Sequence, residues 1–157
     1  MRTKLIQAPL IIIVAVIAVA DAANTFGTYK INVAKSSYTP GPGRIDKTMT
    51  VTRKASKDGV KQATNGEMAD GTPFYASYTS KHDGTYVDVA GNAPFDRIAV
   101  KQVNANTVTD ERKKKGGHYN ATGRTVFSND GKTMTVIIKG TNADDKEFTQ
   151  VLVFDKQ

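Results

Sequence analysis

Two stretches that lie far apart in the chain repeat one alternation of apolar residues with threonine. Positions 47–54 read KTMTVTRK, and positions 132–139 read KTMTVIIK. A period of two that is rich in threonine and valine indicates a β-strand with one face toward a core. Two strands with the same burial requirement explain the repeat without a duplicated functional motif. Its shared apolar positions are Met49, Val51, Met134 and Val136.

Asp-Gly pairs separate many of the alternating segments. They occur at 58–59, 70–71, 83–84 and 130–131, and both residues tolerate the positive φ angles of tight hairpin turns. No segment after residue 22 has an amphipathic helix pattern, although Val33–Ser37 has room for one helical turn. The pattern predicts ten strands, at residues 25–32, 44–54, 60–68, 72–80, 84–89, 96–103, 106–114, 117–128, 132–140 and 146–155.

Short connections place consecutive strands side by side. The sequence therefore predicts an all-β fold, an antiparallel up-and-down meander of about ten strands. Closing this sheet into a barrel would remove its exposed edges, so a barrel is the favoured architecture. An open two-sheet sandwich is the alternative.

The first 22 residues have the parts of a secretory signal peptide. Arg2 and Lys4 give a positive start, Leu10–Ala20 is an unbroken apolar run, and Ala20-Asp21-Ala22 is a cleavage signal. A membrane anchor is the alternative, but the run has about half of the roughly 20 residues that span a bilayer. We therefore expect a signal peptide over 1–22 and one exported domain over 23–157. That domain would be periplasmic or secreted, with a membrane contact only through the signal peptide.

Cysteine is absent, which excludes disulfides and thiolate chemistry. The formal net charge is +7, and it becomes +6 when Arg2, Lys4 and Asp21 leave with the signal peptide. A basic balance favours anionic partners such as lipid headgroups or acidic small molecules, and solubility is an equally good explanation of the charge. Nucleic acid is not an expected partner of an exported protein.

Both ends of the predicted domain resemble calycins. Gly27-Thr28-Tyr29-Lys30-Ile31 is similar to the G-T-W-K-L opening of fatty-acid-binding proteins and, more loosely, to the G-x-W start of lipocalins, with tyrosine in place of tryptophan. Asp130-Gly131-Lys132 and Val153-Phe154-Asp155-Lys156 resemble the last two strands of that group. The stretch from Lys30 to Pro42 is similar to small exported bacterial proteins of unassigned function. The resemblance implies a calycin-type β-barrel that holds an apolar ligand.

Two departures limit what the resemblance implies. Fatty-acid-binding proteins insert a helix-turn-helix lid between their first two strands, where this chain has only Val33 to Gly43. Their last strand carries an Arg-x-Tyr pair that grips the ligand carboxylate bidentately. Leu152 and Phe154 stand at the matching positions here, so the usual carboxylate grip is not expected.

A ligand site is predicted from the strand faces that would point into the barrel. Phe148, Gln150, Leu152 and Phe154 share one face of the last strand, and Gln150 could orient a ligand or meet Arg124. A one-residue shift of register would exchange the two faces, so the sequence leaves the interior face open. The predicted ligand-binding residues are Tyr29, Met49, Val51, Tyr78, Arg124, Met134, Gln150 and Phe154.

No pattern indicates catalysis, a metal or a cofactor. His82 and His118 lie near turns, and Asp83 could join them as a metal ligand. Their spacing does not bring them together, and solvated turn histidines are the better explanation. The chain has no GxSxG elbow, paired-carboxylate pattern or glycine-rich phosphate loop. We therefore predict no enzyme activity, no metal site and no cofactor.

A basic run, Arg112-Lys113-Lys114-Lys115, precedes Gly116-Gly117. At a hairpin tip its four charges would project from one end of the barrel and could dock on an anionic surface. A solvated turn that keeps an edge from pairing is the alternative.

Taken together, these features favour an exported, non-catalytic protein that carries a small apolar or amphipathic molecule in a β-barrel. The alternative is an envelope interaction module, with a barrel filled by its own side chains and the basic run docked on an anionic partner. A cavity of a few hundred Å3 would support the first hypothesis, and a solid interior would support the second. An enzyme with residues gathered from several strands is a third and weaker hypothesis.

Overall fold

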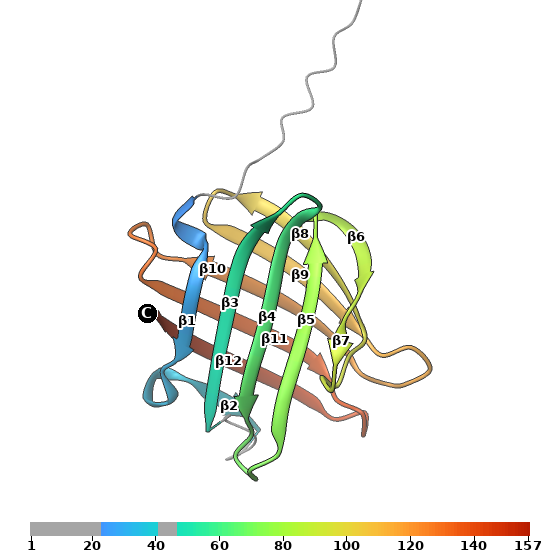
Figure 1. The fold of residues 1–157 in the computed structure, drawn as a ribbon. Coiled ribbons are helices and arrows are strands. Elements are labelled where there is room, and N and C mark those ends of the chain that lie inside the picture. The colour runs from blue at the N-terminus through green and yellow to red at the C-terminus, as the bar shows by residue number, and fades with distance from the viewer. Residues whose placement is uncertain (1–22, 41–46) are drawn as a thin grey trace, which may run out of the picture.

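The chain folds into one antiparallel β-sheet that curls into a nearly closed barrel (Figure 1). The computed structural model describes residues 23–40 and 47–157, and the predicted signal peptide lies outside them. Two short 3-10 helices accompany the strands, η1 (Ala23–Thr25) and η2 (Val33–Lys35). The strands are β1 (Gly27–Ile31), β2 (Ser37–Thr39), β3 (Thr48–Ser56), β4 (Gly59–Glu67), β5 (Pro73–Ser80), β6 (Asp83–Asp88), β7 (Ala90–Gly91), β8 (Arg97–Asn104), β9 (Thr107–Lys113), β10 (Asn120–Phe127), β11 (Thr133–Thr141) and β12 (Glu147–Lys156).

Strands that follow one another in the chain are neighbours almost everywhere in the sheet. The order is β6-β8-β9-β10-β11-β12-β1-β3-β4-β5-β7, and β2 pairs with β12. The first and last long strands meet, with Tyr29 opposite Lys156 and Ile31 opposite Phe154. This arrangement confirms the predicted up-and-down meander. The strands form a single continuous sheet, so the two-sheet alternative is wrong.

The barrel has one seam, between β5 and β6. These strands are consecutive in the chain, but β6 pairs with β8. On the other side of the seam, β5 pairs with β7 at Ala76 and Ser77. In Figure 1 the strands β1, β3, β4 and β5 form the near wall and cross the strands of the far wall steeply.

Each of the ten predicted strands overlaps one observed strand. The two additional strands, β2 and β7, have 3 and 2 residues. The helical turn expected between Val33 and Ser37 corresponds to η2, where Asn32 caps the turn by accepting a hydrogen bond from the Lys35 backbone N–H. The difference in strand count is minor, since both extra strands only extend the sheet locally.

The alternation along each strand now fixes the interior face. On β3, Met49, Val51 and Arg53 are buried, whereas the threonines between them lie on the outer side. The second copy of the repeat behaves in the same way on β11, where Met134 and Val136 are buried. The repeated octapeptide therefore supplies the same inward face to two strands of one barrel.

The N-terminal turn η1 closes one end of the barrel, which we call the closed end. Thr25 is fully buried there, and its carbonyl accepts a hydrogen bond from Arg53 Nε at 3.2 Å. Tyr29 and Phe127 pack edge to face beneath it, with ring centroids 5.8 Å apart. The Tyr29 hydroxyl donates to the carbonyls of Asn24 and Gly131, at 3.1 and 3.3 Å.

Replacing Tyr29 by phenylalanine is expected to remove this hydroxyl at a cost of about 1 kcal/mol in the free energy of unfolding. Burial raises the pKa of Tyr29 above its ordinary value of 10.0, and the charge of Arg53 offsets part of that rise. The stabilisation from neutral Tyr29 is thus complete below pH 10 and is lost as the pH rises through the raised pKa. Urea unfolding at pH 8 and near pH 11 should show the wild type losing its advantage over the variant at the higher pH. An advantage that persists unchanged would contradict this assignment.

The helices of the described part are three residues each. None of them is long and apolar enough to cross a membrane.

Candidate ligand-binding cavity

The interior of the barrel holds a cavity of about 320 Å3. It extends from Arg53, next to the closed end, to the end opposite η1, where loop residues Pro94 and Asn142 line it. We call that end the mouth, and it is formed by the loops 92–96, 114–119 and 142–146. The loops contact one another there, since the Lys115 backbone N–H donates to Asp96 Oδ1 at 2.8 Å.

Most of the cavity wall is apolar. The inward faces of β3, β11 and β12 supply aliphatic and thioether side chains that alternate with the outward-facing residues. Sequence positions that are distant from one another, such as those of the repeated octapeptide, therefore meet in one wall. The apolar residues of this wall are Met49, Val51, Met134, Val136, Ile138, Leu152 and Phe154.

Four aromatic rings lie in contact across the mouth. Tyr38 stacks on Phe148 with 5.9 Å between ring centroids. Phe148 then contacts Tyr119 at 5.9 Å, and Tyr119 stacks on Phe95 at 5.8 Å. Tyr38 and Phe148 come from the paired strands β2 and β12, and Tyr119 and Phe95 come from the loops before β10 and β8. The aromatic row therefore connects this strand pair to two loops of the mouth.

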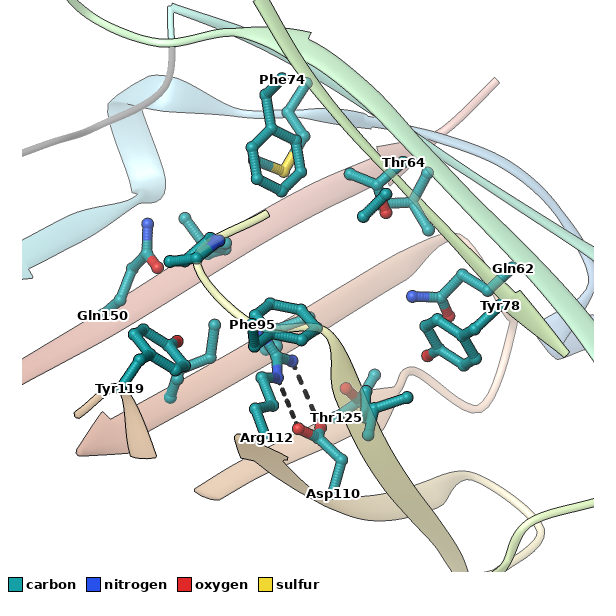
Figure 2. Close-up of a pocket in the computed structure, with 18 of the residues that line it drawn as sticks. Gln62, Thr64, Phe74, Tyr78, Phe95, Asp110, Arg112, Tyr119, Thr125 and Gln150 are labelled. Atoms are coloured by element: carbon teal, nitrogen blue, oxygen red, sulfur yellow. Dashed lines mark hydrogen bonds and ion pairs between the residues drawn. The ribbon is translucent and has the colours of Figure 1, made fainter. Parts of the chain in front are cut away.

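A buried ion pair lies next to the aromatic row. Asp110 and Arg112 are two residues apart on β9, so both point inward. Arg112 Nε donates to Asp110 Oδ1 at 2.6 Å, and Nη2 donates to Oδ2 at 3.3 Å. The side chains of Asp110 and Arg112 are only 5% and 15% exposed, respectively. Figure 2 shows both contacts, with the ring of Phe95 over the guanidinium, whose centre is 5.2 Å from that ring.

The electrostatics of this pair keep Arg112 charged. Burial by itself would lower the pKa of Arg112, but the carboxylate of Asp110, through its charge and its hydrogen bonds, outweighs burial and raises that pKa above its ordinary value. Tyr119 and Tyr78 act in the same direction. The cavity therefore contains a fixed pair of opposite charges.

Gly123 makes room for the carboxylate. It lies opposite Asp110 in the ladder between β9 and β10, and a Cβ at this position would collide with the carboxylate group. The glycine is needed here for space, because its backbone is ordinary strand. The neighbouring inward positions of β10 are also small, Ala121 and Thr125.

A second guanidinium lies deeper, at the closed end. Arg53 is 2% exposed, and besides Thr25 it contacts Gln62, to which Nη1 donates at 2.8 Å. Its guanidinium also lies 4.9 Å above the ring of Phe127. In Figure 2, Gln62 and Tyr78 line one side of the cavity, and Gln150 and Tyr119 line the other. Polar groups thus approach an otherwise apolar space from several strands.

The structure brings together six of the eight residues predicted for the ligand site. These six line the cavity, and they are Met49, Val51, Tyr78, Met134, Gln150 and Phe154. Tyr29 is fully buried but belongs to the packing of the closed end. Arg124 does not line the interior as expected, because the alternation of β10 places it on the outer face.

Several lining residues were not predicted from the sequence. Asp110 and Arg112 form the ion pair, and Phe95 and Tyr119 belong to the aromatic row. The sequence signal for Asp110 and Arg112 is the D-x-R spacing at 110–112, which puts opposite charges on one face of a strand. Hydrophobic alternation does not predict such a pair in the interior, because it assigns charged residues to the outer surface.

The basic run is not arranged as expected. β9 continues to Lys113, so Arg112 lies within the strand and faces inward, and the run does not project four charges together. Lys113 lies 3.9 Å from Glu111, and Lys114 lies 3.3 Å from Asp96. Docking of Lys113, Lys114 and Lys115 on an anionic surface stays a prediction.

The two histidines lie at opposite ends of the barrel. His82 is in the turn between β5 and β6 at the closed end and is 7% exposed, so the expectation of a solvated turn histidine is wrong for it. Its Nδ1 lies 2.9 Å from Gln102 Oε1. His118 is exposed at the mouth, with Nδ1 2.6 Å from Asp145 Oδ2. In residues 23–40 and 47–157, no cluster of three histidine or carboxylate side chains could hold a metal ion.

Comparisons with known proteins find similarity among solved structures but not among protein families. No family model matches the chain, and no curated protein matches it. A de novo designed fluorescence-activating β-barrel is similar, with a TM-score of 0.41 and 15% sequence identity over 88% of this chain and 99% of the designed chain. A likeness of this degree carries no argument about function, so the description of the barrel rests on its strand pairing.

Proposed function

We propose that this protein binds a small apolar or amphipathic molecule inside its barrel and that it does so without catalysis. The observation that carries the proposal is the interior cavity of about 320 Å3, lined by an apolar wall with a few polar groups directed into it. Pockets of roughly 300–1,000 Å3 with this composition are the usual form of small-molecule sites. A carrier is favoured over an interaction module because the side chains of the barrel do not fill it.

Export belongs to the same proposal. The features of residues 1–22 support a signal peptide, and they would place the barrel in the periplasm or outside the cell. Membership of the calycins is likewise proposed, on the strength of the motifs at the two ends of the domain. The direct test of binding is to purify the protein without detergent, extract it under denaturing conditions and identify bound molecules by mass spectrometry.

Filling the cavity is expected to abolish most of the binding. Ala76 on β5 is buried and lines the cavity, so the ring of Ala76→Phe would occupy the space that a ligand needs. We expect the affinity for the neutral fluorescent probe N-phenyl-1-naphthylamine to fall by about tenfold or more. Fluorescence titration measures this affinity, and the chain has no tryptophan whose emission would interfere.

Ala63→Phe is the matched control for this substitution. Ala63 lies on the neighbouring strand β4 and faces outward between the cavity residues Gln62 and Thr64. The same change in side chain should therefore leave probe affinity unaltered. Equal losses in both variants, or no probe binding by the wild type together with no co-purified molecule, would contradict the proposed function.

A further inference from the structure

The ion pair of the cavity calls for an explanation other than stability. Moving two charges out of water is costly, and apolar residues of similar volume at such positions are often as stabilising or more so. Here the chain holds Asp110 and Arg112 in a bidentate arrangement and keeps position 123 free of a side chain to accommodate them. The pair lies in the wall of the cavity, where a ligand would meet it.

One edge of the guanidinium remains available to a ligand. Nε and Nη2 are committed to Asp110, and one face of the group lies against Phe95. Within the described residues, the hydrogen bonds of Arg112 are those from Nε and Nη2 to Asp110, so no protein acceptor is bonded to Nη1. A guanidinium has five N–H donors, so this nitrogen can donate to an acceptor atom inside the cavity.

The charge at this donor is already balanced. A carboxylate or phosphate on the ligand would have to lie close to the Asp110 carboxylate, and like charges at that distance in a low-dielectric interior repel one another strongly. An uncharged acceptor such as a carbonyl, ester or hydroxyl oxygen meets no such repulsion. Arg53 also lines the cavity, but it lies deeper, where it donates to Thr25 and Gln62, so Arg112 is the guanidinium nearer the mouth.

The remaining walls fit a compact apolar body. Aromatic rings cover the mouth and aliphatic side chains form the far wall, and the volume of about 320 Å3 is at the lower end of the range for small-molecule pockets. A flat ring system can pack against Phe95 and Tyr119 while its substituent reaches Arg112.

We propose that the cavity selects compact, uncharged ring compounds that carry a hydrogen-bond acceptor, and that Arg112, held in place by Asp110, donates the hydrogen bond that recognises this acceptor. The inference rests on the proposed function, since it names the class of ligand that the same cavity takes. It assigns Arg112 as the specificity-determining contact and Asp110 as the residue that excludes anions.

Three probes on one skeleton test this assignment. 2-Acetylnaphthalene carries a neutral acceptor, 2-ethylnaphthalene carries none, and 2-naphthoate carries a charge. Competition against N-phenyl-1-naphthylamine at pH 7.5 gives their relative affinities for the wild-type protein. We expect the ketone to bind about tenfold tighter than the hydrocarbon, as a hydrogen bond to a charged group implies, and the carboxylate to bind more weakly than the ketone.

Two variants then locate the contact. Arg112→Met should bring the affinities of the ketone and the hydrocarbon together, because the donor is lost. Asp110→Asn should shift the preference toward 2-naphthoate by about tenfold or more, because the charge of Arg112 is no longer balanced. Circular dichroism confirms that each variant is folded, and Lys113→Met, one residue along β9, should change none of the three affinities.

The relative affinities of the three probes for the wild-type protein test the ligand class even if a variant fails to fold. Equal affinities for the ketone and the hydrocarbon, or tighter binding of 2-naphthoate, would overturn the assignment of ligand class while leaving a binding protein. If none of the three probes nor N-phenyl-1-naphthylamine binds, the assignment of ligand class fails, and the proposed function fails with it when no molecule co-purifies. A ketone preference that survives Arg112→Met in a folded protein would show that another group makes the contact.

Discussion

Replacing Phe127 by alanine is expected to lower the free energy of unfolding by about 3–5 kcal/mol. Phe127 is 2% exposed and packs between Tyr29, 5.8 Å away in an edge-to-face contact, and the guanidinium of Arg53, 4.9 Å above its ring. Truncation would leave a void at the closed end and remove the aromatic face on which a buried cation lies. Urea unfolding followed by circular dichroism measures the loss.

Val126→Ala is the control for this prediction. Val126 precedes Phe127 on β10, faces outward and is 37% exposed. Removing methyl groups from such a position should change the free energy of unfolding by no more than about 0.5 kcal/mol. If the two variants lost similar amounts, β10 would not have the inward face described here.

The fold was predictable because the chain is dense in local turn and strand signals. Asp-Gly pairs lie in the β3–β4, β4–β5 and β10–β11 turns, and asparagine or paired glycines mark the other hairpin turns. Asp-Gly pairs specify turns, and alternation specifies strands, so an all-β meander follows without any long-range information. The closure of β12 on β1 follows in turn from the cost of leaving two long edges unpaired. Strands β2 and β7 escaped prediction because 3 and 2 residues are too few for alternation to appear.

The candidate site was predictable mainly where burial and hydrophobicity agree. Met49 and Met134 satisfy both, whereas β10 reverses the usual pattern. Its inward positions are small, Ala121 and Gly123 among them, and the long side chain of Arg124 points outward. The reason lies on the neighbouring strand, since the Asp110 carboxylate occupies the space above Gly123. The requirement for a small residue at position 123 depends on the partner strand, so the local sequence of β10 gives no sign of it.

The basic run at 112–115 also shows that the sequence did not predict which charged side chains face inward. Four consecutive cations suggest a solvated hairpin tip, although the strand predicted over 106–114 already contains the first three of them. In the structure the alternation of β9 applies to Arg112 and Lys113. Arg112 then faces the interior, where Asp110 compensates its charge, and Lys113 faces outward beside Glu111. Strand alternation therefore decides which cation faces the surface and which faces the cavity.

Arg112→Met is expected to lower the free energy of unfolding by about 3–5 kcal/mol, because it leaves the Asp110 carboxylate buried without its partner. Methionine keeps much of the length of the arginine side chain, so the loss would report the charge and not a void. The double substitution Asp110→Leu with Arg112→Met removes both charges, and most of the lost stability should return, since apolar replacement of a complete buried pair is often nearly neutral. Urea unfolding of the wild type and of the single and double variants gives the coupling between the two side chains.

The same series separates the two roles of the pair. If the double variant recovers stability but no longer distinguishes 2-acetylnaphthalene from 2-ethylnaphthalene, the ion pair is maintained for recognition and not for folding. A double variant as unstable as Arg112→Met would instead mean that the barrel needs these charges to pack its interior, because the two apolar replacements would then fail to fill a space shaped by Gly123 and Phe95. Since the pair is buried and bidentate, the coupling should exceed the roughly 0.2–1 kcal/mol that is typical of exposed ion pairs, by about threefold or more.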